Sequence, residues 1–323
     1  MKKKSRVVMI GAAVAAVSMF TVTAFASTPN QDGYKAFKEV LKANQMSEHT
    51  IESGTVNGDL TVTLNGATVL EASGQAKMEN TGERPGISGD FDFNLNGIGR
   101  SASMYSSGDD SVYLIDETHG LHYQVINIGE EHPGKHGGRP DEGSYEHRPM
   151  NKAEEALLDY IVGDLKNNFS VVSHADGSKT IEVLVSKEEV PLPVRMLIDV
   201  ASAADRNGHE DEQEASAEWE AALQLPFFQG LEAADLEQLL PELVEDVAIE
   251  RVHLQLTVDQ DNMLQRVQGE LEVSGKDEAG TAHRVKLAGA GGISSVNATT
   301  PDVYDPAGHS VDIIDAEALV DCS

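Results

Sequence analysis

Three stretches of the chain alternate strictly between apolar and polar residues, and this alternation is the strongest constraint on the fold. They are residues 59–64, 90–95 and 251–258. Because successive side chains of a β-strand point to opposite faces, such stretches form strands with one buried and one solvated face. Burial on one side only is typical of antiparallel sheets. The sequence therefore predicts an antiparallel sheet with one apolar face.

Turn residues follow the predicted strands at the spacing of hairpins. Asn65-Gly66 and Asn96-Gly97 favour the tight two-residue turn whose backbone needs positive φ. Asp176-Gly177 predicts another hairpin turn, and residues 259–262 predict one more.

Apolar residues recur at helical spacing in four segments, which predicts helices there. The segments are residues 32–45, residues 151–166, residues 194–201 behind Pro191 and Pro193, and residues 236–244 around Pro241, which we expect to break or kink the last helix.

The first 26 residues are organised like a secretory signal peptide. Three lysines at positions 2–4 precede an apolar run over residues 7–22, and Ala24-Phe25-Ala26 provides a cleavage site. We expect cleavage after Ala26. A retained anchor is the alternative, because the run approaches the roughly 20 residues that cross a bilayer. The segment predicts a secreted, extracytoplasmic protein with no stable membrane anchor after cleavage.

The rest of the chain is strongly acidic. The whole chain has 24 Lys and Arg against 54 Asp and Glu, a formal charge of −30, and the charge becomes −34 once the four basic residues of the signal peptide are removed. This charge repels phosphate backbones and anionic headgroups, so we expect no nucleic-acid partner.

We expect one α+β domain over residues 27–303 with two loop insertions. The insertion over 129–150 is rich in Gly, Pro and His, and the insertion over 205–220 carries seven acids and one arginine. Residues 304–323 are expected to form an acidic C-terminal tail.

The order of helix, hairpins, central helices and further hairpins resembles the LolA and LppX group of bacterial envelope proteins. Secreted Gram-positive relatives are similar in three motifs: the Y-K-A-F-K-x-x-L helix from Tyr34 to Leu41, the Asn-Gly hairpin from Val62 to Gly66, and T-T-P-D from Thr299 to Asp302. The resemblance covers residues 32–303. It implies an α+β fold in which a strongly curved antiparallel sheet, an incomplete barrel, carries helices packed on its concave side. It also implies binding of an apolar ligand or an envelope regulatory role.

The apolar face of the sheet supplies the main candidate ligand-binding residues. In a curved sheet this face could line a cavity beneath the helices, and an ordinary packed core is the alternative. The candidates are Leu60, Val62, Leu64, Phe91, Phe93, Leu95, Leu254, Leu256 and Val258.

Two further groups are candidates. Trp219, Phe227 and Phe228 gather scarce aromatics beside the acidic insertion, and we expect them at the opening of a ligand cavity or, alternatively, as anchors of the insertion. His132, His136 and His147 could bind a transition metal, although a polar surface loop is the alternative interpretation.

Motifs of catalysis are missing from the sequence. It contains no G-x-S-x-G elbow and no H-E-x-x-H pair. We therefore expect no enzyme and no cofactor. The leading hypothesis is a non-enzymatic binding protein for a hydrophobic small molecule in the cell envelope. The alternative is an interaction or regulatory module that binds an envelope protein.

Overall fold

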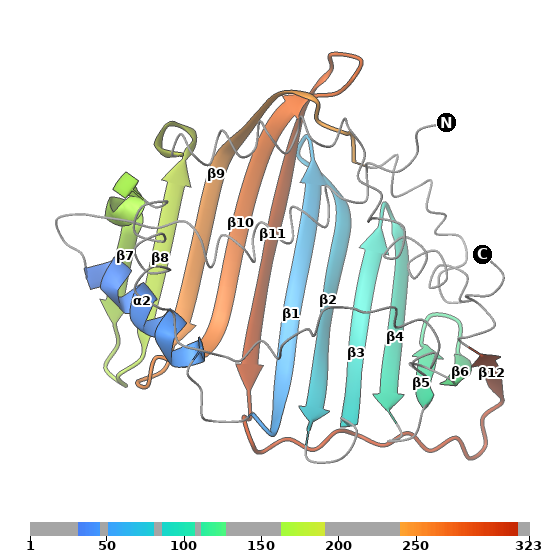
Figure 1. The fold of residues 1–323 in the computed structure, drawn as a ribbon. Coiled ribbons are helices and arrows are strands. Elements are labelled where there is room, and N and C mark those ends of the chain that lie inside the picture. Colours follow the sequence, from blue (N-terminus) through green and yellow to red (C-terminus); the bar gives the residue numbers. More distant parts are fainter. Residues whose placement is uncertain are drawn as a thin grey trace, which may run out of the picture.

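A single sheet of twelve strands is the frame of the part of the chain that the computed structural model describes, namely residues 32–45, 51–80, 86–106, 111–126, 163–190 and 240–315 (Figure 1). The strands are β1 Ser53–Leu64, β2 Ala67–Glu79, β3 Gly86–Leu95, β4 Ile98–Ser106, β5 Ser111–Asp116, β6 Leu121–Ile126, β7 Phe169–Ser173, β8 Lys179–Ser186, β9 Glu245–Val258, β10 Leu264–Lys276, β11 Ala282–Ser294 and β12 Val311–Asp315.

The strand order is β12-β6-β5-β4-β3-β2-β1-β11-β10-β9-β8-β7. Strands β1 to β6 form one run of antiparallel neighbours, and β7 to β11 form another. The pairing of β1 with β11 joins the two runs, with Thr55 opposite Ser294. Only β12 pairs in parallel, along β6, among the strands described. The antiparallel sheet predicted from the alternating stretches is therefore confirmed.

The predicted hairpin turns are also confirmed. Asn65 and Gly66 have φ values of 53° and 86°, and Asn96 and Gly97 have values of 49° and 88°. Two consecutive positive φ values match the twist of the flanking strands, and Asn and Gly adopt them at the lowest cost.

One α-helix, α2 Asp32–Gln45, is found in the described residues, as the apolar spacing predicted. It lies across β7 and β8 at one end of the sheet (Figure 1). Tyr34 and Phe37 are buried and pack on the ring of Phe169 in β7, with ring centroids 5.5 and 5.4 Å away. Asp32 in the first turn and Lys42 in the last turn complement the helix dipole.

The expected α+β fold with helices packed on a concave side is wrong. The described residues form mostly one large sheet, and their single α-helix packs mainly on β7 and β8, with Asn44 hydrogen-bonded to the β9–β10 turn and to Leu264. The physical reason is that alternation shows that a face is buried, whereas hairpin motifs do not specify what packs on it.

None of the other predicted helices is found as an α-helix in the described residues. Residues 163–166 belong to a short 3-10 helix, η1 Gly163–Asn168, rather than to an α-helix, and a second one, η2 Lys187–Glu189, follows β8. Residues 240–244 contain no helix, consistent with the lack of a backbone donor at Pro241. Residues 151–162, 194–201 and 236–239 lie outside the described residues.

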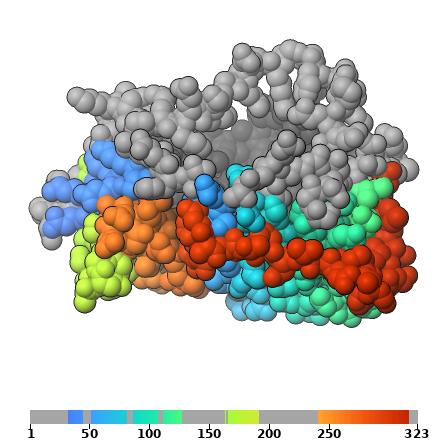
Figure 2. Space-filling model, turned by 90° about the horizontal axis from the view of Figure 1, so that it is seen from below, coloured from blue at the N-terminus to red at the C-terminus, as the bar shows by residue number. Residues whose placement is uncertain are grey.

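A strap, residues 295–310, connects β11 to β12 and runs across the lower ends of the strands (Figure 1). Figure 2 looks at those ends from below and shows it as part of the red band across them. The strap carries the T-T-P-D motif, and β12 after it belongs to the segment that was expected to be a C-terminal tail.

Candidate functional site

The nine residues that were predicted to share the apolar face of the sheet do lie on one face. Across the strands, Leu60 is opposite Ala72, which is opposite Phe93, and Val62 is opposite Leu70. Directly opposed residues in an antiparallel pair point to the same side. The apolar face therefore runs continuously through β1, β2 and β3, and the pairings of β11, β10 and β9 extend it to Leu254, Leu256 and Val258.

Burial differs between the two ends of this face. At the α2 end, eighteen buried residues form one core cluster that includes Val62, Leu254, Leu256 and Val258, with Leu60 and Leu64 packed against it. At the other end, the buried cluster among the described residues consists of Ala102, Leu114 and Tyr123, with Phe91 and Phe93 partly buried against it. Leu95 is buried beside the β3–β4 turn.

A row of glycines crosses the apolar face on β11, β1 and β2. Gly291, Gly58 and Gly74 are opposite one another on three neighbouring strands, and Gly89 and Gly289 lie beside them. A Cβ atom at Gly89 would lie 2.6 Å from the carbonyl oxygen of Gln75, and one at Gly74 would lie 2.8 Å from that of Asp90. Side chains are sterically excluded at these two positions because the backbones approach too closely.

Two titratable side chains, Asp116 and Tyr123, are buried near the smaller cluster. Asp116 is completely buried, and its carboxylate accepts hydrogen bonds from the backbone and the Nδ1 atom of His119, at 3.0 and 2.7 Å. Burial and the nearby Asp116 carboxylate raise the pKa of Tyr123. The phenol is therefore neutral and packs as an aromatic residue.

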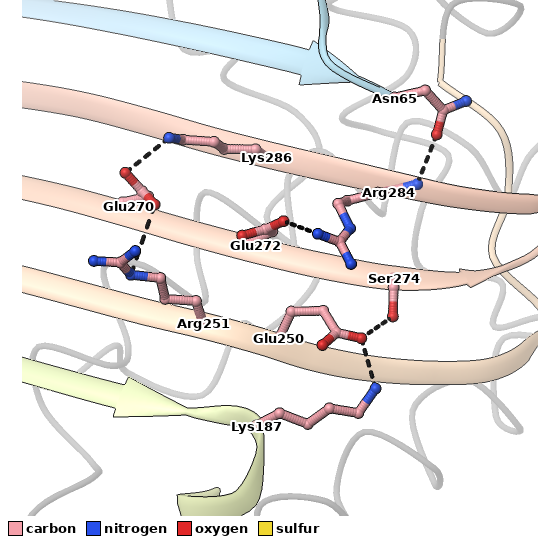
Figure 3. A network of polar contacts seen from close by, with 9 residues as sticks. All are labelled: Asn65, Lys187, Glu250, Arg251, Glu270, Glu272, Ser274, Arg284 and Lys286. Atoms are coloured by element: carbon pink, nitrogen blue, oxygen red, sulfur yellow. Dashed lines mark hydrogen bonds and ion pairs between the residues drawn. The ribbon is translucent and has the colours of Figure 1, made fainter.

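The opposite face of the sheet is polar, and over β9–β11 its charges are paired (Figure 3). Glu270 lies 2.9 Å from Lys286 and 3.9 Å from Arg251, while Arg284 lies 3.0 Å from Glu272. Charges on neighbouring strands thus neutralise one another.

Glu250 of β9 lies at the edge of this group of paired charges. Its carboxylate accepts hydrogen bonds from Lys187, at 2.6 Å, and from the hydroxyl of Ser274 (Figure 3). These bonds, the Lys187 bond foremost, lower the pKa of Glu250. The carboxylate therefore stays ionised at neutral pH.

An open hollow of about 370 Å³ interrupts the polar face over β1, β2, β3, β10 and β11. It is lined by Asn57, Gly58, Asp59, Ser73, Gly74, Gln75, Asp90, Asp92, Arg266 and Ala290. None of these residues was a candidate in the sequence, where they occupy solvated positions of strands and carry no motif. The alternation itself was the only signal available, because it assigns the side chains to a common polar face.

Several predicted site residues lie outside the described residues. They are Trp219, Phe227, Phe228, His132, His136 and His147. In the part of the chain that is described, no group of three or more His, Cys, Asp or Glu side chains could hold a metal ion. The same part contains no helix that is long and apolar enough to span a membrane.

Comparison with known proteins gives no family assignment. No known family matches the sequence, and no curated protein matches it. Among solved structures, a DUF1329 family protein from Desulfovibrio piger is 11% identical, with a TM-score of 0.20, over 88% of this chain and 98% of that one. A LolA superfamily protein from Nitrosomonas europaea is 8% identical, with a TM-score of 0.17, over 83% and 94%. At these TM-scores neither likeness assigns a function to this chain. The two faces of the sheet are therefore the basis for a functional assignment.

Proposed function

We propose that this chain is a secreted, non-enzymatic binding protein that holds a hydrophobic or lipid-like ligand on the apolar face of its sheet, over β2, β3 and β4. The proposed location is the cell envelope, outside the cytoplasm. An envelope interaction module without a small-molecule ligand is the alternative that a negative test would favour.

The observation that carries the proposal is an aromatic pair standing on a floor of small residues. Phe91 is opposite Gly74 on one side and Ala102 on the other, and Phe93 is opposite Ala72 on one side and Arg100 on the other. Glycine within a strand leaves room for a close approach of another group to the backbone. Two rings above such a floor provide an apolar contact surface, and small-molecule sites are lined mostly by such hydrophobic and aromatic side chains.

The contrast with the α2 end supports this choice of place. There the apolar face is filled by eighteen buried side chains, which is an ordinary packed core. At the β3–β6 end the buried cluster has three members among the described residues, and Phe91 and Phe93 are only partly buried. Apolar surface that is only partly covered gains free energy when a ligand removes it from water, at about 25 cal/mol per Å².

A titration with a fluorescent fatty acyl probe tests the proposal. We expect saturable binding at roughly tens of micromolar, which corresponds to about −7 kcal/mol. Replacing Phe91 and Phe93 together by Ala should weaken the probe affinity about tenfold or more, because each tenfold step requires only about 1.4 kcal/mol.

The matched control is Val172→Ala in β7, which removes an apolar side chain that is 56% exposed on the polar face. It should leave probe affinity unchanged. Unfolding midpoints confirm that each variant is folded. Absence of binding by the folded wild-type protein, or equal losses in the two variants, would reject the proposal. Saturable change of Trp219 emission would in addition place that side chain near the ligand.

A further inference from the structure

The hollow on the polar face is built by two rows of polar side chains. Asn57, Gln75 and Asp90 lie opposite one another on β1, β2 and β3, and the next row contains Asp59, Ser73 and Asp92 in the same order. Side chains of one row stand about 4.8 Å apart, the distance between neighbouring strands. The hollow therefore presents a regular lattice of hydrogen-bonding groups.

Small residues on β11 make the hollow possible. Gly292 lies between Arg266 of β10 and Asn57 of β1, and Ala290 is the neighbour of Asp59. A Cβ atom at Gly292 would lie 3.1 Å from the Oδ1 atom of Asn57 and 3.0 Å from a backbone oxygen. The missing side chain thus keeps a gap open between a guanidinium group and the polar rows.

The strap lies along one side of this hollow. The row adjacent to Asn57, Gln75 and Asp90 consists of Thr55, Lys77 and Ser88. Thr299 and Asp302 of the strap bind this row: the Thr299 hydroxyl lies 3.1 Å from that of Thr55, and the Asp302 carboxylate 2.8 Å from Lys77 Nζ. The T-T-P-D motif therefore borders the hollow.

Side chains in the hollow differ from the rest of the polar face in their lack of partners. Outside the hollow, Arg251, Glu270, Glu272, Arg284 and Lys286 of β9–β11 are joined in ion pairs (Figure 3). In the hollow, by contrast, the side chains of Asn57, Asp59, Gln75 and Arg266 make no hydrogen bond or ion pair with any described residue. Their hydrogen-bonding capacity is available to a ligand.

Two of the three carboxylates, one in each row, are oriented by serine hydroxyls. Asp90 accepts a hydrogen bond from Ser103 at 2.9 Å, and Asp92 accepts one from Ser101. Both serines lie on β4, on the side of the hollow away from Arg266. These bonds hold two acceptors in place facing the donors of Arg266 and the amides.

We infer that the hollow is a binding site for a neutral saccharide chain. Three carboxylates would repel a phosphate or another anion. A cation would pair with the carboxylates but would offer no hydrogen-bond acceptor to the guanidinium group of Arg266. An apolar ligand would leave all these groups without hydrogen bonds. Saccharide hydroxyls both donate and accept, so they match carboxylate acceptors, guanidinium donors and the mixed amides of Asn57 and Gln75 together.

This site is independent of the proposed hydrophobic site. It occupies the opposite face of the same strands, so loss of one activity predicts nothing about the other. The volume of about 370 Å³ lies within the range of small-ligand sites, which run from about 300 to 1,000 Å³.

Isothermal titration calorimetry of the full chain tests the inference with the neutral probes N-acetylchitohexaose, cellohexaose and maltohexaose. At least one should bind with a dissociation constant below about 1 mM. The variant Arg266→Ala should weaken that binding about tenfold. The double variant Asp59→Ala and Gln75→Ala should weaken it at least as much.

The matched control is Arg284→Ala, which removes an arginine from the same face that is paired with Glu272 outside the hollow. It should change the affinity less than about twofold. Arg266→Ala removes an exposed side chain with no described partner, so the fold should survive and this variant alone decides the test.

Three results would overturn the inference. One is failure of all three oligosaccharides to bind at roughly 10 mM, a concentration that detects affinities of only a few kcal/mol. Another is equal binding by the wild type and Arg266→Ala. The third is tighter binding of spermidine or inorganic phosphate than of any saccharide, which would assign the hollow to a charged ligand.

Discussion

The hydroxyl of Tyr304 lies 2.7 Å from the Nδ1 atom of His122, although 182 residues separate the two in sequence. Tyr304 belongs to the strap and His122 to β6. The Tyr304 ring also contacts the rings of Tyr105 and Tyr113, with centroids 5.7 and 4.9 Å away. The end of the described chain is therefore fixed by an aromatic cluster on the polar face, and β12 is delivered to the edge of β6.

The strap should stabilise the sheet mainly through the Tyr304 ring. Tyr304→Phe removes one hydrogen bond and should cost about 1 kcal/mol of unfolding free energy. Tyr304→Ala also removes the ring contacts with Tyr105 and Tyr113, and we expect a loss of about 2–4 kcal/mol. Urea unfolding of the two variants provides the measurement. Equal losses would contradict the assigned role of the ring.

Close backbone approach makes Gly89 irreplaceable. In Gly89→Ala the new Cβ would meet the Gln75 carbonyl oxygen at 2.6 Å, so we expect destabilisation of about 1–3 kcal/mol. The control is Gly99→Ala in β4, where a Cβ meets no heavy atom within 4 Å. That variant should be neutral or slightly stabilised in thermal unfolding. A tolerated Gly89→Ala would show that the strands are further apart than described.

The assigned faces of β9 can be tested with one charge placed on either side. Leu256 is 4% exposed in the core below α2, and Leu256→Asp should cost more than about 3 kcal/mol because an unpaired charge enters the core. Its neighbour Gln255 is on the polar face opposite Glu182, so Gln255→Asp should cost less than about 1 kcal/mol. Chemical unfolding distinguishes them, and similar losses would refute the faces.

A fall in pH should reduce the contribution of Glu250 to the free energy of unfolding. Its pKa is lowered in the folded protein by the bond from Lys187, so its stabilisation is complete above the unfolded value of about 4.3. It is lost as the pH falls through the folded pKa. Glu250→Gln should therefore cost about 1 kcal/mol at pH 7 and nearly nothing near pH 3.

The control for this pH dependence is Glu71→Gln, at an exposed carboxylate on the polar face of β2. The wild type and this variant should differ little at either pH when unfolding free energies are measured in urea. A penalty of Glu250→Gln that is the same at pH 3 and pH 7 would disprove the role of the ionised carboxylate.

The predicted signal peptide has a direct test. N-terminal sequencing of the exported protein should begin at Ser27, because the small residues Ala24 and Ala26 suit the peptidase site. A chain that keeps Met1 and remains in the membrane fraction would instead indicate the retained anchor.

Local sequence determined the strands, their faces and several turns. The alternation around Val62 and Leu256 predicts which side chains are buried, because the period of two follows from strand geometry. Asn65-Gly66 predicts the hairpin turn, because few residues adopt positive φ at low cost. The spacing of Tyr34, Phe37 and Val40 predicts helix α2 for the same kind of local reason.

Only the tertiary structure determined which strands pair and which residues pack on each face of the sheet. The pairing of Thr55 with Ser294 joins two strands at residues that are 239 positions apart in the sequence. The hydrogen bonds of this pairing are made by backbone atoms, so they do not depend on residue type and cannot be predicted from it. Alternation predicts a buried face but not its cover, so the expected helices on that face were wrong. The hollow likewise exists only because Gly292 comes to lie between Arg266 and Asn57, and sheet order, a long-range property, brings these three residues together.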